Sequence, residues 1–384
     1  MTELLIAGGG FAGVWAAMAA AATRQQEGAT DLSIRLVSNT DQLSIRPRLY
    51  EGATPEMLVP MRPLFDEIGI ELTLGEISGI SPSTVRLGTS ETLHHNRLIL
   101  ATGSQAHLPP IPGAEEFGFV VDTHDSTQRL DRHLGTLDVN DTGAGTILTV
   151  GASFTGLEVA LALRSRLGRA FRVLLIDRNK LPGAGLGDAL EAEVHRALRE
   201  NDIQFKGETS VASVSERHVQ LSTGEEIETR TLIFATGFRA SPLTQLLPNH
   251  CPQDGRVPVD ADLRVSSVPT IFAAGDVALA QADADHHTLM SCQHAIPMGL
   301  AAGKNAVLDM LGKATSAYSQ PFYATCLALG PYGAVFTNGW DREVIKTRVE
   351  GAAMKTQINT QWIYPPRPEL GRDKIFATIF GELD

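Results

Sequence analysis

The sequence predicts an α/β fold made of two similar parallel-sheet domains, the second inserted into the first, with a small α+β region at the C-terminal end. Two glycine-rich turns carry this prediction: they occupy residues 8–13 (GGGFAG) and 151–156 (GASFTG) and start 143 residues apart. Each turn follows an apolar run, residues 4–7 or 147–150, that is typical of a buried parallel strand. The repetition indicates two copies of one structural unit.

The segments after each turn complete a strand–helix–strand unit. Residues 14–24 and 157–167 are rich in good helix formers, and residues 31–37 and 171–176 can form the next strand. A glycine turn in this place lets the backbone approach a pyrophosphate, which binds the free N–H groups and the positive end of the helix. One such motif is weak evidence, but two in this context predict two Rossmann-like dinucleotide-binding domains.

The two copies differ at the end of their second strand. Asp177 lies 21 residues after Gly156, where a carboxylate accepts hydrogen bonds from the ribose hydroxyls of a nucleotide. In the first copy this place falls at Ser38 and Asn39, which can hold a ribose only through neutral hydrogen bonds. Asp177 would repel a 2′-phosphate and so favours NADH, although the neighbouring Arg178 keeps NADPH open.

Length and composition limit the functional classes. The 384 residues, of which 43% are hydrophobic, suffice for two or three domains with a substantial core. The net charge of −12 argues against a nucleic-acid partner, which needs a concentrated basic face. No stretch reaches the roughly 18 to 20 uncharged apolar residues of a membrane span, and the N-terminal segment lacks the basic start of a signal peptide. We therefore expect a cytoplasmic protein.

The cysteines and histidines form no recognisable metal or disulfide motif. Cys251, Cys292 and Cys326 are scattered without CxxC spacing, so each is expected to be a buried structural thiol, and only Cys292 falls beside a segment assigned to a cofactor below. Residues 283–287 (DADHH) are of the kind that bind metals, but their place in a loop favours a solvated acidic segment. The sequence predicts no metal site.

Further motifs give the domain boundaries. Two strands end in the same tripeptide, Ala101-Thr102-Gly103 and Ala235-Thr236-Gly237, and these bracket the inserted domain. A buried strand ends at Gly275-Asp276, a helix is expected from about residue 294 to 311, and Asn338-Gly339 signals a hairpin in the tail. We predict a first domain of residues 1–113 and 241–312, an inserted domain of residues 114–240, and a C-terminal region of residues 313–384.

These motifs in this order resemble the flavoproteins of the pyridine nucleotide-disulfide reductase superfamily. Within it the chain resembles the type II NADH:quinone oxidoreductases and the apoptosis-inducing-factor-like quinone reductases. The motifs that carry the resemblance are residues 8–13, 101–103, 151–158, 235–237 and 274–276. The resemblance implies FAD in the first domain and NADH, with NADPH as the alternative, in the inserted one.

The resemblance also assigns the residues that hold the cofactors. Gly8, Gly10 and Gly13 would bind the FAD pyrophosphate, and Asp276, which closes a strand at the ligand-binding edge of the sheet, would bind hydroxyls of the same cofactor. A turn cap is the alternative for Asp276, and a solvated loop charge is the alternative for Arg48. The predicted cofactor-binding residues are Gly8, Gly10, Gly13, Ser38, Arg48, Ala101, Thr102, Gly103, Gly151, Ser153, Gly156, Asp177, Gly237, Gly275, Asp276 and, by resemblance only, Lys355.

Three residues are predicted to act on the reacting rings. By resemblance, Glu158 reaches toward the nicotinamide and the flavin, where a buried carboxylate would have a raised pKa and could relay a proton. Gln293 and His294 open the helix whose N-terminus faces reduced flavin in this family, and both could donate hydrogen bonds to the flavin or a quinone. The alternatives are a simple first-turn glutamate for Glu158, and helix caps or solvent-facing side chains for Gln293 and His294.

Departures from the superfamily pattern narrow the expected reaction. The chain lacks the closely spaced cysteine pair through which disulfide reductases pass electrons. We expect an FAD-dependent NAD(P)H dehydrogenase that passes hydride from NADH to flavin and then electrons to a quinone or similar small acceptor. Two alternatives stay open: a reductase of a small ferredoxin- or rubredoxin-type protein, and an NADH-sensing flavoprotein.

The C-terminal region is expected to cover the flavin and the acceptor site, as it does in similar quinone reductases. Membrane-bound members lay helices of this region on a bilayer, so peripheral contact with the inner face of a membrane is left open. Trp340, Trp362 and Tyr364 could anchor such contact, but packing against the flavin domain is the favoured role.

Overall fold

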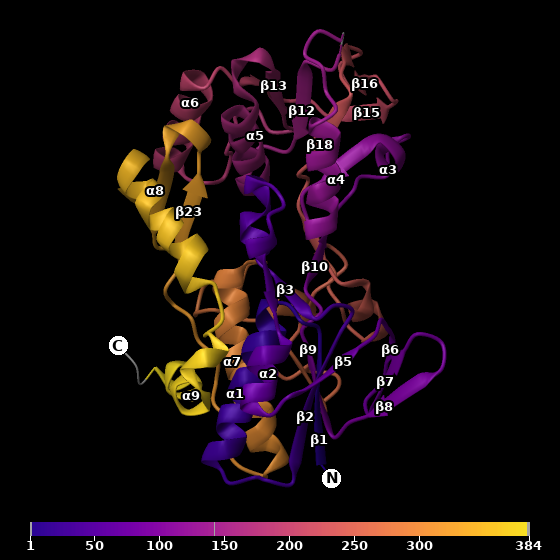
Figure 1. Cartoon of the computed structure of the whole chain (residues 1–384), viewed down its shortest axis with the longest axis vertical. Helices are drawn as coiled ribbons and strands as arrows, with labels where there is room; N and C mark the ends of the chain where they lie inside the picture. Colours follow the sequence, from indigo (N-terminus) through magenta and orange to yellow (C-terminus); the bar gives the residue numbers. More distant parts are fainter. Residues whose placement is uncertain (1, 142, 382–384) are drawn as a thin grey trace.

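A computed structural model describes residues 2–141 and 143–381, and it has the α/β architecture that the sequence predicts. Two parallel sheets are stacked along the long axis of the molecule, with the sheet around β1 at the bottom and the sheet around β12 at the top of Figure 1. The C-terminal segments, in yellow, run along one side of both halves. No helix of the described residues is long and apolar enough to cross a membrane.

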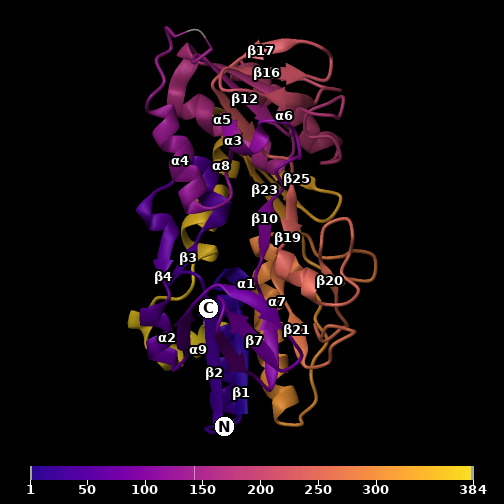
Figure 2. The same ribbon diagram turned by 90° about the vertical axis from the view of Figure 1, so that its right-hand side faces the viewer.

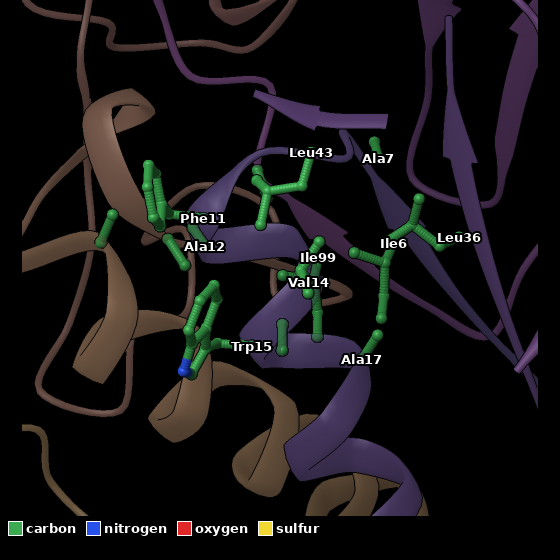
Figure 3. Close-up of a cluster of buried hydrophobic side chains, with 14 of the residues drawn as sticks. Ile6, Ala7, Phe11, Ala12, Val14, Trp15, Ala17, Leu36, Leu43 and Ile99 are labelled. Atoms are coloured by element: carbon green, nitrogen blue, oxygen red, sulfur yellow. The ribbon is translucent and has the colours of Figure 1, made fainter. Parts of the chain in front are cut away.

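The first sheet has five parallel strands in the order β21-β9-β1-β2-β5. The last four residues of β1 are completely buried, since elements cover both faces of the sheet. Helix α1 packs on one face, and its Val14 lies in the same buried cluster as Ile6 and Ile99 (Figure 3). These elements are β1 (Thr2–Ala7), α1 (Phe11–Gln26), β2 (Leu32–Ser38), β5 (Glu71–Leu74), β9 (Arg97–Leu100) and β21 (Ile271–Ala273).

The second sheet repeats this topology in the order β11-β18-β12-β13-β14. In both sheets the strand before the glycine turn is central and its end is level with its neighbour, because Ala7 lies opposite Leu100 and Val150 opposite Phe234. The strands are β11 (Gly118–Val120), β12 (Thr146–Val150), β13 (Arg172–Ile176), β14 (Gln204–Lys206) and β18 (Thr231–Phe234).

Each half also carries a small antiparallel sheet of three strands, which extends the internal repeat. The first consists of β6 (Ile77–Ile80), β7 (Thr84–Leu87) and β8 (Glu91–His94), and the second of β15 (Val211–Val214), β16 (His218–Leu221) and β17 (Glu226–Glu228). The remaining elements of the two halves are β3 (Gln42–Ser44), the 3-10 helix η1 (Arg46–Glu51), β4 (Leu58–Pro60), α2 (Arg62–Ile68), α3 (Ala114–Phe117), α4 (His124–Leu134), α5 (Phe154–Leu167), α6 (Asp188–Glu200), β20 (Val257–Pro258), β22 (Ala278–Leu279) and α7 (Cys292–Met310).

Two short antiparallel strands, β10 (Ser104–Ala106) and β19 (Phe238–Ala240), connect the halves (Figure 2). Each follows one of the two Ala-Thr-Gly tripeptides, so the chain crosses between the halves at equivalent points. The backbone N–H of His107 donates to the carbonyl of Gly237 at 2.9 Å and closes this junction. The domain boundaries at residues 113, 240 and 312 stay a prediction.

Helix α7 lies directly against α1, and two glycines permit the close approach. A Cβ atom at Gly299 would lie 2.3 Å from the carbonyl oxygen of Ala12, and one at Gly303 would lie 2.2 Å from that of Ala16. A larger residue at either position would therefore have to push the helices apart.

Helix α7 begins two residues earlier than the sequence suggests. Ser291 caps it, and its hydroxyl accepts from the backbone N–H of His294 at 3.4 Å. Pro297 lies inside the helix and has no N–H for the carbonyl of Gln293, but the side-chain amide of Gln320 donates to that carbonyl at 3.0 Å. The backbone carbonyl of Gln293, which Pro297 leaves without its helical partner, thus accepts a hydrogen bond from the C-terminal region.

The C-terminal region contacts both halves. Its sheet packs on α5 and α6, because Leu327 and Val335 share a buried cluster with Leu157 and Leu190, and its last helix packs on α1. The hairpin predicted at Asn338-Gly339 is confirmed. The elements are β23 (Ala324–Ala328), β24 (Ala334–Asn338), β25 (Glu343–Lys346), α8 (Arg348–Gln357), the π-helix η7 (Ile358–Trp362) and α9 (Arg372–Phe380).

The contact between α1 and α7 gives a test of the fold. Gly303→Leu is expected to lower the free energy of unfolding by about 3 kcal/mol, because the new side chain must enter the backbone of α1. Lys304→Leu, on the exposed side of the same helix, should change it by less than about 0.5 kcal/mol. Thermal unfolding of both variants measures the difference, and equal midpoints would contradict the packing.

Candidate active site

A cavity of about 750 Å³ lies at the carboxyl ends of β1, β9 and β21. This edge of a parallel sheet is where doubly wound folds bind ligands. The predicted residues that line it are Gly8, Gly10, Ser38, Ala101, Thr102, Gly103, Glu158, Gly275 and Asp276. The structure therefore brings together the first fingerprint, the first tripeptide, the Gly-Asp turn and one residue of the second half.

The first glycine turn is shaped by the strand beside it. Gly8 has a φ of +114°, and a Cβ there would lie 2.3 Å from the carbonyl oxygen of Ala101. Gly13 in turn sits against the carbonyl of Gly8. No side chain within the described residues caps the N-terminus of α1, and Gly9 and Gly10 line the cavity beside it. The helix end is thus open to an anion such as a pyrophosphate.

The second turn has the same construction. Gly151 has a φ of +103°, and a Cβ there would lie 2.2 Å from the carbonyl oxygen of Ala235, while Gly156 sits against Gly151. Ser153 is the exposed N-cap residue of α5. Gly237 follows β18 as Gly103 follows β9, so both tripeptides support a glycine turn in the same way.

Asp177 lies at the end of β13 and is already tied to the backbone around it. Its carboxylate accepts from the N–H of Ala152 at 2.7 Å and from the N–H of Asn179 at 2.7 Å. In the first half Ser38 takes the equivalent place, against Gly9. The carboxylate thus braces the glycine turn, and its remaining lone pairs can accept from a ribose.

Asp276 faces the cavity from the turn after β21. Ser104 donates to its carboxylate at 2.6 Å, and the guanidinium of Arg46 lies 3.9 Å away. Burial raises the pKa of Asp276, and the charge of Arg46 and the hydrogen bond from Ser104 only partly oppose this. Arg46 is itself held by an ion pair with Asp122. A ligand hydroxyl that donates to Asp276 would compensate the buried charge.

Glu158 enters the cavity wall from α5, in the other half of the molecule, and it does not stand alone there. Lys355 donates to its carboxylate at 2.9 Å and also to the carbonyl of Cys326 at 2.9 Å, and the backbone N–H of Ala328 donates to the same carboxylate at 3.0 Å. Burial acts against the charge of Lys355, but the attraction of Glu158 outweighs it and raises the pKa of Lys355. The carboxylate for which the resemblance implies a proton relay is thus one half of an ion pair, and it accepts hydrogen bonds from both Lys355 and Ala328.

Gln293 and His294 do not line the cavity. The amide of Gln293 pairs with the backbone of Ala324, donating at 2.7 Å and accepting at 3.0 Å in the orientation that satisfies both groups. His294 is fully buried and its Nδ1 lies 3.1 Å from Gln320; burial lowers its pKa. The start of α7 instead presents Ser291, Cys292 and Ala295 to the cavity.

Arg48 also lies outside the lining, because η1 is a 3-10 helix in which residues three apart share a side. Pro47 and Tyr50 face the cavity, whereas Arg48 and Glu51 face away and form an ion pair at 2.8 Å. The segment around Arg48 therefore lines the cavity through Pro47 and Tyr50, and Arg48 lies on its other side. Lys355, too, lies outside the lining, behind Glu158 and the ring of Tyr50.

Many lining residues were not predicted as site residues, and among them are Arg46, Tyr50, Ser104, Thr155 and Cys292. A three-residue period through residues 46–51 would have indicated Tyr50. The sequence could also have indicated Thr155, because it lies three residues before Glu158 and so on the same face of the predicted helix.

The two similar halves, each with a glycine turn between a parallel strand and a helix, define an α/β protein with two Rossmann-like domains. The family profile of the pyridine nucleotide-disulphide oxidoreductases matches residues 2–299, and the chain belongs to this family. FAD and NADH are its cofactors, and the open helix end, the carboxylate of Asp276 and the volume of about 750 Å³ fit a dinucleotide in the first half.

Individual relatives agree with this assignment. An NADH dehydrogenase-like protein of Mycobacterium tuberculosis is 39% identical over 380 residues, which cover 95% of either chain. The demethylphylloquinone reductase of Synechocystis is 29% identical over 289 residues, or 71% of either chain. The solved structure of NDH2 from Plasmodium falciparum in complex with RYL-552 has a TM-score of 0.80 over 99% of this chain and 98% of that chain, at 11% identity, which is a similarity of fold.

The buried ion pair gives a second test. Lys355→Met leaves the carboxylate of Glu158 without its cation and is expected to lower the free energy of unfolding by about 3–5 kcal/mol. Lys206→Met, which breaks an ion pair with Glu225 nearer the surface, should cost less than about 1 kcal/mol. The double variant Lys355→Met/Glu158→Gln should recover much of the loss in denaturant unfolding. A single variant as stable as the parent would show that the pair contributes nothing.

Proposed function

We propose that the chain is an FAD-dependent NADH dehydrogenase that reduces a quinone or a similar small acceptor. The observation that carries this proposal is that Thr155 and Glu158 of α5 line the cavity of the first half. Because α5 begins at the second fingerprint, a nucleotide held at its N-terminus would extend toward the same cavity. One wall would then serve both ligands, as direct hydride transfer requires.

In this proposal the chain holds, orients and separates its ligands. The N-termini of α1 and α5 would bind the two pyrophosphates, and Asp276 and Asp177 would accept from ligand hydroxyls. FAD, when bound, accepts hydride from NADH and releases the electrons to an acceptor. The ion pair of Glu158 and Lys355 gives the cavity wall a fixed hydrogen-bond acceptor that resists displacement by water.

The state of the thiols supports a small acceptor over a protein dithiol. Burial raises the pKa of Cys292 and of Cys326 to about 11 each, and the cation of Lys355 only partly opposes this. Both thiols are therefore protonated near neutral pH, whereas disulfide exchange needs a thiolate. The name of the Synechocystis relative, a demethylphylloquinone reductase, supports a quinone.

We also propose that any contact with a membrane surface is made by the C-terminal region. The side chains of Trp362 and Val349 are 55% and 81% exposed. In contrast, Trp340 stacks on Tyr323 at 4.3 Å, and Tyr364 accepts from a guanidinium nitrogen of Arg48 at 3.0 Å. Of the aromatic anchors suggested by the sequence, Trp362 is the one available to an interface.

The test is a pair of half-reactions with the FAD-loaded protein in the absence of oxygen. NADH is expected to bleach the visible flavin absorbance, and a soluble quinone is expected to restore it in rapid mixing. Reoxidation by a ferredoxin-type protein alone would favour the reductase alternative, and a persistent reduced state would favour the sensor. Protein that stays colourless when FAD is supplied would refute the proposal.

The nucleotide preference is a separate prediction. The negative charge of Asp177 should make kcat/KM for NADH exceed that for NADPH by about tenfold or more. Asp177→Asn should narrow the ratio, although it also weakens the brace on Ala152. Asp188→Asn, at the start of α6, removes the same charge elsewhere and should leave the ratio of the two kcat/KM values unchanged. Equal kcat/KM values for NADH and NADPH in the parent protein would contradict the role of Asp177.

A further inference from the structure

We propose that the hydroxyl of Tyr50 donates a hydrogen bond to a carbonyl oxygen of the electron acceptor, and that Asn359 orients this hydroxyl. This inference rests on the proposed function and names a subsite for a quinone in the same cavity. Tyr50 belongs to η1 in the first half, and Asn359 belongs to the π-helix η7 in the C-terminal region.

Tyr50 lies at the end of the cavity where the two halves and the C-terminal region meet. It lines the cavity together with Glu158. The Nζ atom of Lys355 lies 5.3 Å from the centroid of the Tyr50 ring and 2.9 Å from the Glu158 carboxylate, so the two lining residues flank one cation. The ring of Tyr50 is therefore on the side of the cavity that α5 also reaches.

A chain of hydrogen bonds that begins at Arg48 sets the direction of this hydroxyl. Two guanidinium nitrogens of Arg48 hold the carboxylate of Glu51, at 2.8 and 3.2 Å. A carboxylate can only accept, so the amide nitrogen of Asn359 must face Glu51, and it donates there at 2.9 Å. The same nitrogen donates its second hydrogen to the hydroxyl oxygen of Tyr50 at 3.2 Å.

This arrangement leaves the hydrogen of the Tyr50 hydroxyl for a ligand in the cavity that Tyr50 lines. Its oxygen already accepts from Asn359, and no described residue is recorded as accepting its hydrogen. The amide oxygen of Asn359 is buried without a hydrogen-bond partner, which costs free energy. An amide that no other contact held in place would rotate to avoid this cost. The orientation is thus imposed by Glu51, and the π-helix, an irregularity common at functional sites, brings Asn359 into this position.

Tyr50 is suited to bind an acceptor oxygen and unsuited to protonate it. Burial, reinforced by the negative charges of Glu158 and Glu51, raises the pKa of Tyr50 far above its ordinary value. The overall reaction, NADH plus a proton plus quinone giving NAD⁺ plus quinol, takes two electrons and one proton from hydride and its second proton from solvent. The hydroxyl keeps its own proton and fixes the position of the carbonyl.

The first experiment measures binding rather than turnover. Oxidised, FAD-loaded protein is titrated with a soluble short-chain quinone in the absence of NADH, and the dissociation constant is read from the flavin fluorescence. Tyr50→Phe is expected to weaken binding about fivefold to tenfold, the effect of one lost hydrogen bond. Tyr332→Phe, which removes a hydroxyl bonded to Glu193 outside the cavity, is the matched control and should bind like the parent.

The second experiment separates the roles of Tyr50 and Asn359. Asn359→Leu should weaken quinone binding in the same direction, and adding it to Tyr50→Phe should cause no further loss, because both act through one hydroxyl. In rapid mixing, both variants should need more quinone for reoxidation. The control Tyr332→Phe should be reduced by NADH and reoxidised by quinone and by ferricyanide like the parent. Asn359→Asp serves where the leucine variant does not fold.

The outcomes distinguish the inference from the function on which it rests. Quinone binding and reoxidation that are unchanged in Tyr50→Phe would overturn the inference and leave the proposed function intact. A parent protein that ferricyanide reoxidises but no quinone binds or reoxidises would overturn both. Additive effects of Tyr50→Phe and Asn359→Leu would overturn the positioning role of Asn359.

Discussion

The N-terminal part of helix α5 enters the wall of a cavity that belongs to the other half of the molecule, and the remaining features of the site depend on this contact. It places Glu158 beside the lining residues of η1, and the proposed function requires this contact so that the two fingerprints can serve one reaction space. A bare carboxylate in this position would be costly to bury. Lys355, supplied by α8, makes the contact stable and ties the C-terminal region to the junction.

The two halves join the central strand to the following helix through the same kind of glycine turn. In each, a glycine with a positive φ lies against the alanine of an Ala-Thr-Gly tripeptide, which lets a strand turn into a helix with its N–H groups exposed. They differ in the residue behind the turn, Asp177 in one and Ser38 in the other. The duplicated geometry is thus compatible with the proposal that two different nucleotides bind at two similar turns.

Local patterns were enough to predict the fold and the cavity edge. Glycine turns, buried strands and helix formers depend on neighbours in sequence, so both fingerprints, the tripeptides and the hairpin at Asn338-Gly339 were found where the structure has them. The side that a residue faces depends on distant contacts instead. Arg48 was selected and Tyr50 missed because the 3-10 geometry of η1 was not anticipated. Gln293 and His294 turn away from the cavity because Ala324 and Gln320, far along the chain, engage them.

The most direct measurement of the central claim is a crystal structure of the protein with FAD and an unreactive analogue of NADH. The account predicts both ligands in one continuous space, with the reacting carbon of the nicotinamide within about 3.5 Å of the flavin ring and with Thr155 and Glu158 beside the pair. Ligands bound in separate pockets, with side chains of α5 or η1 between their rings, would contradict it.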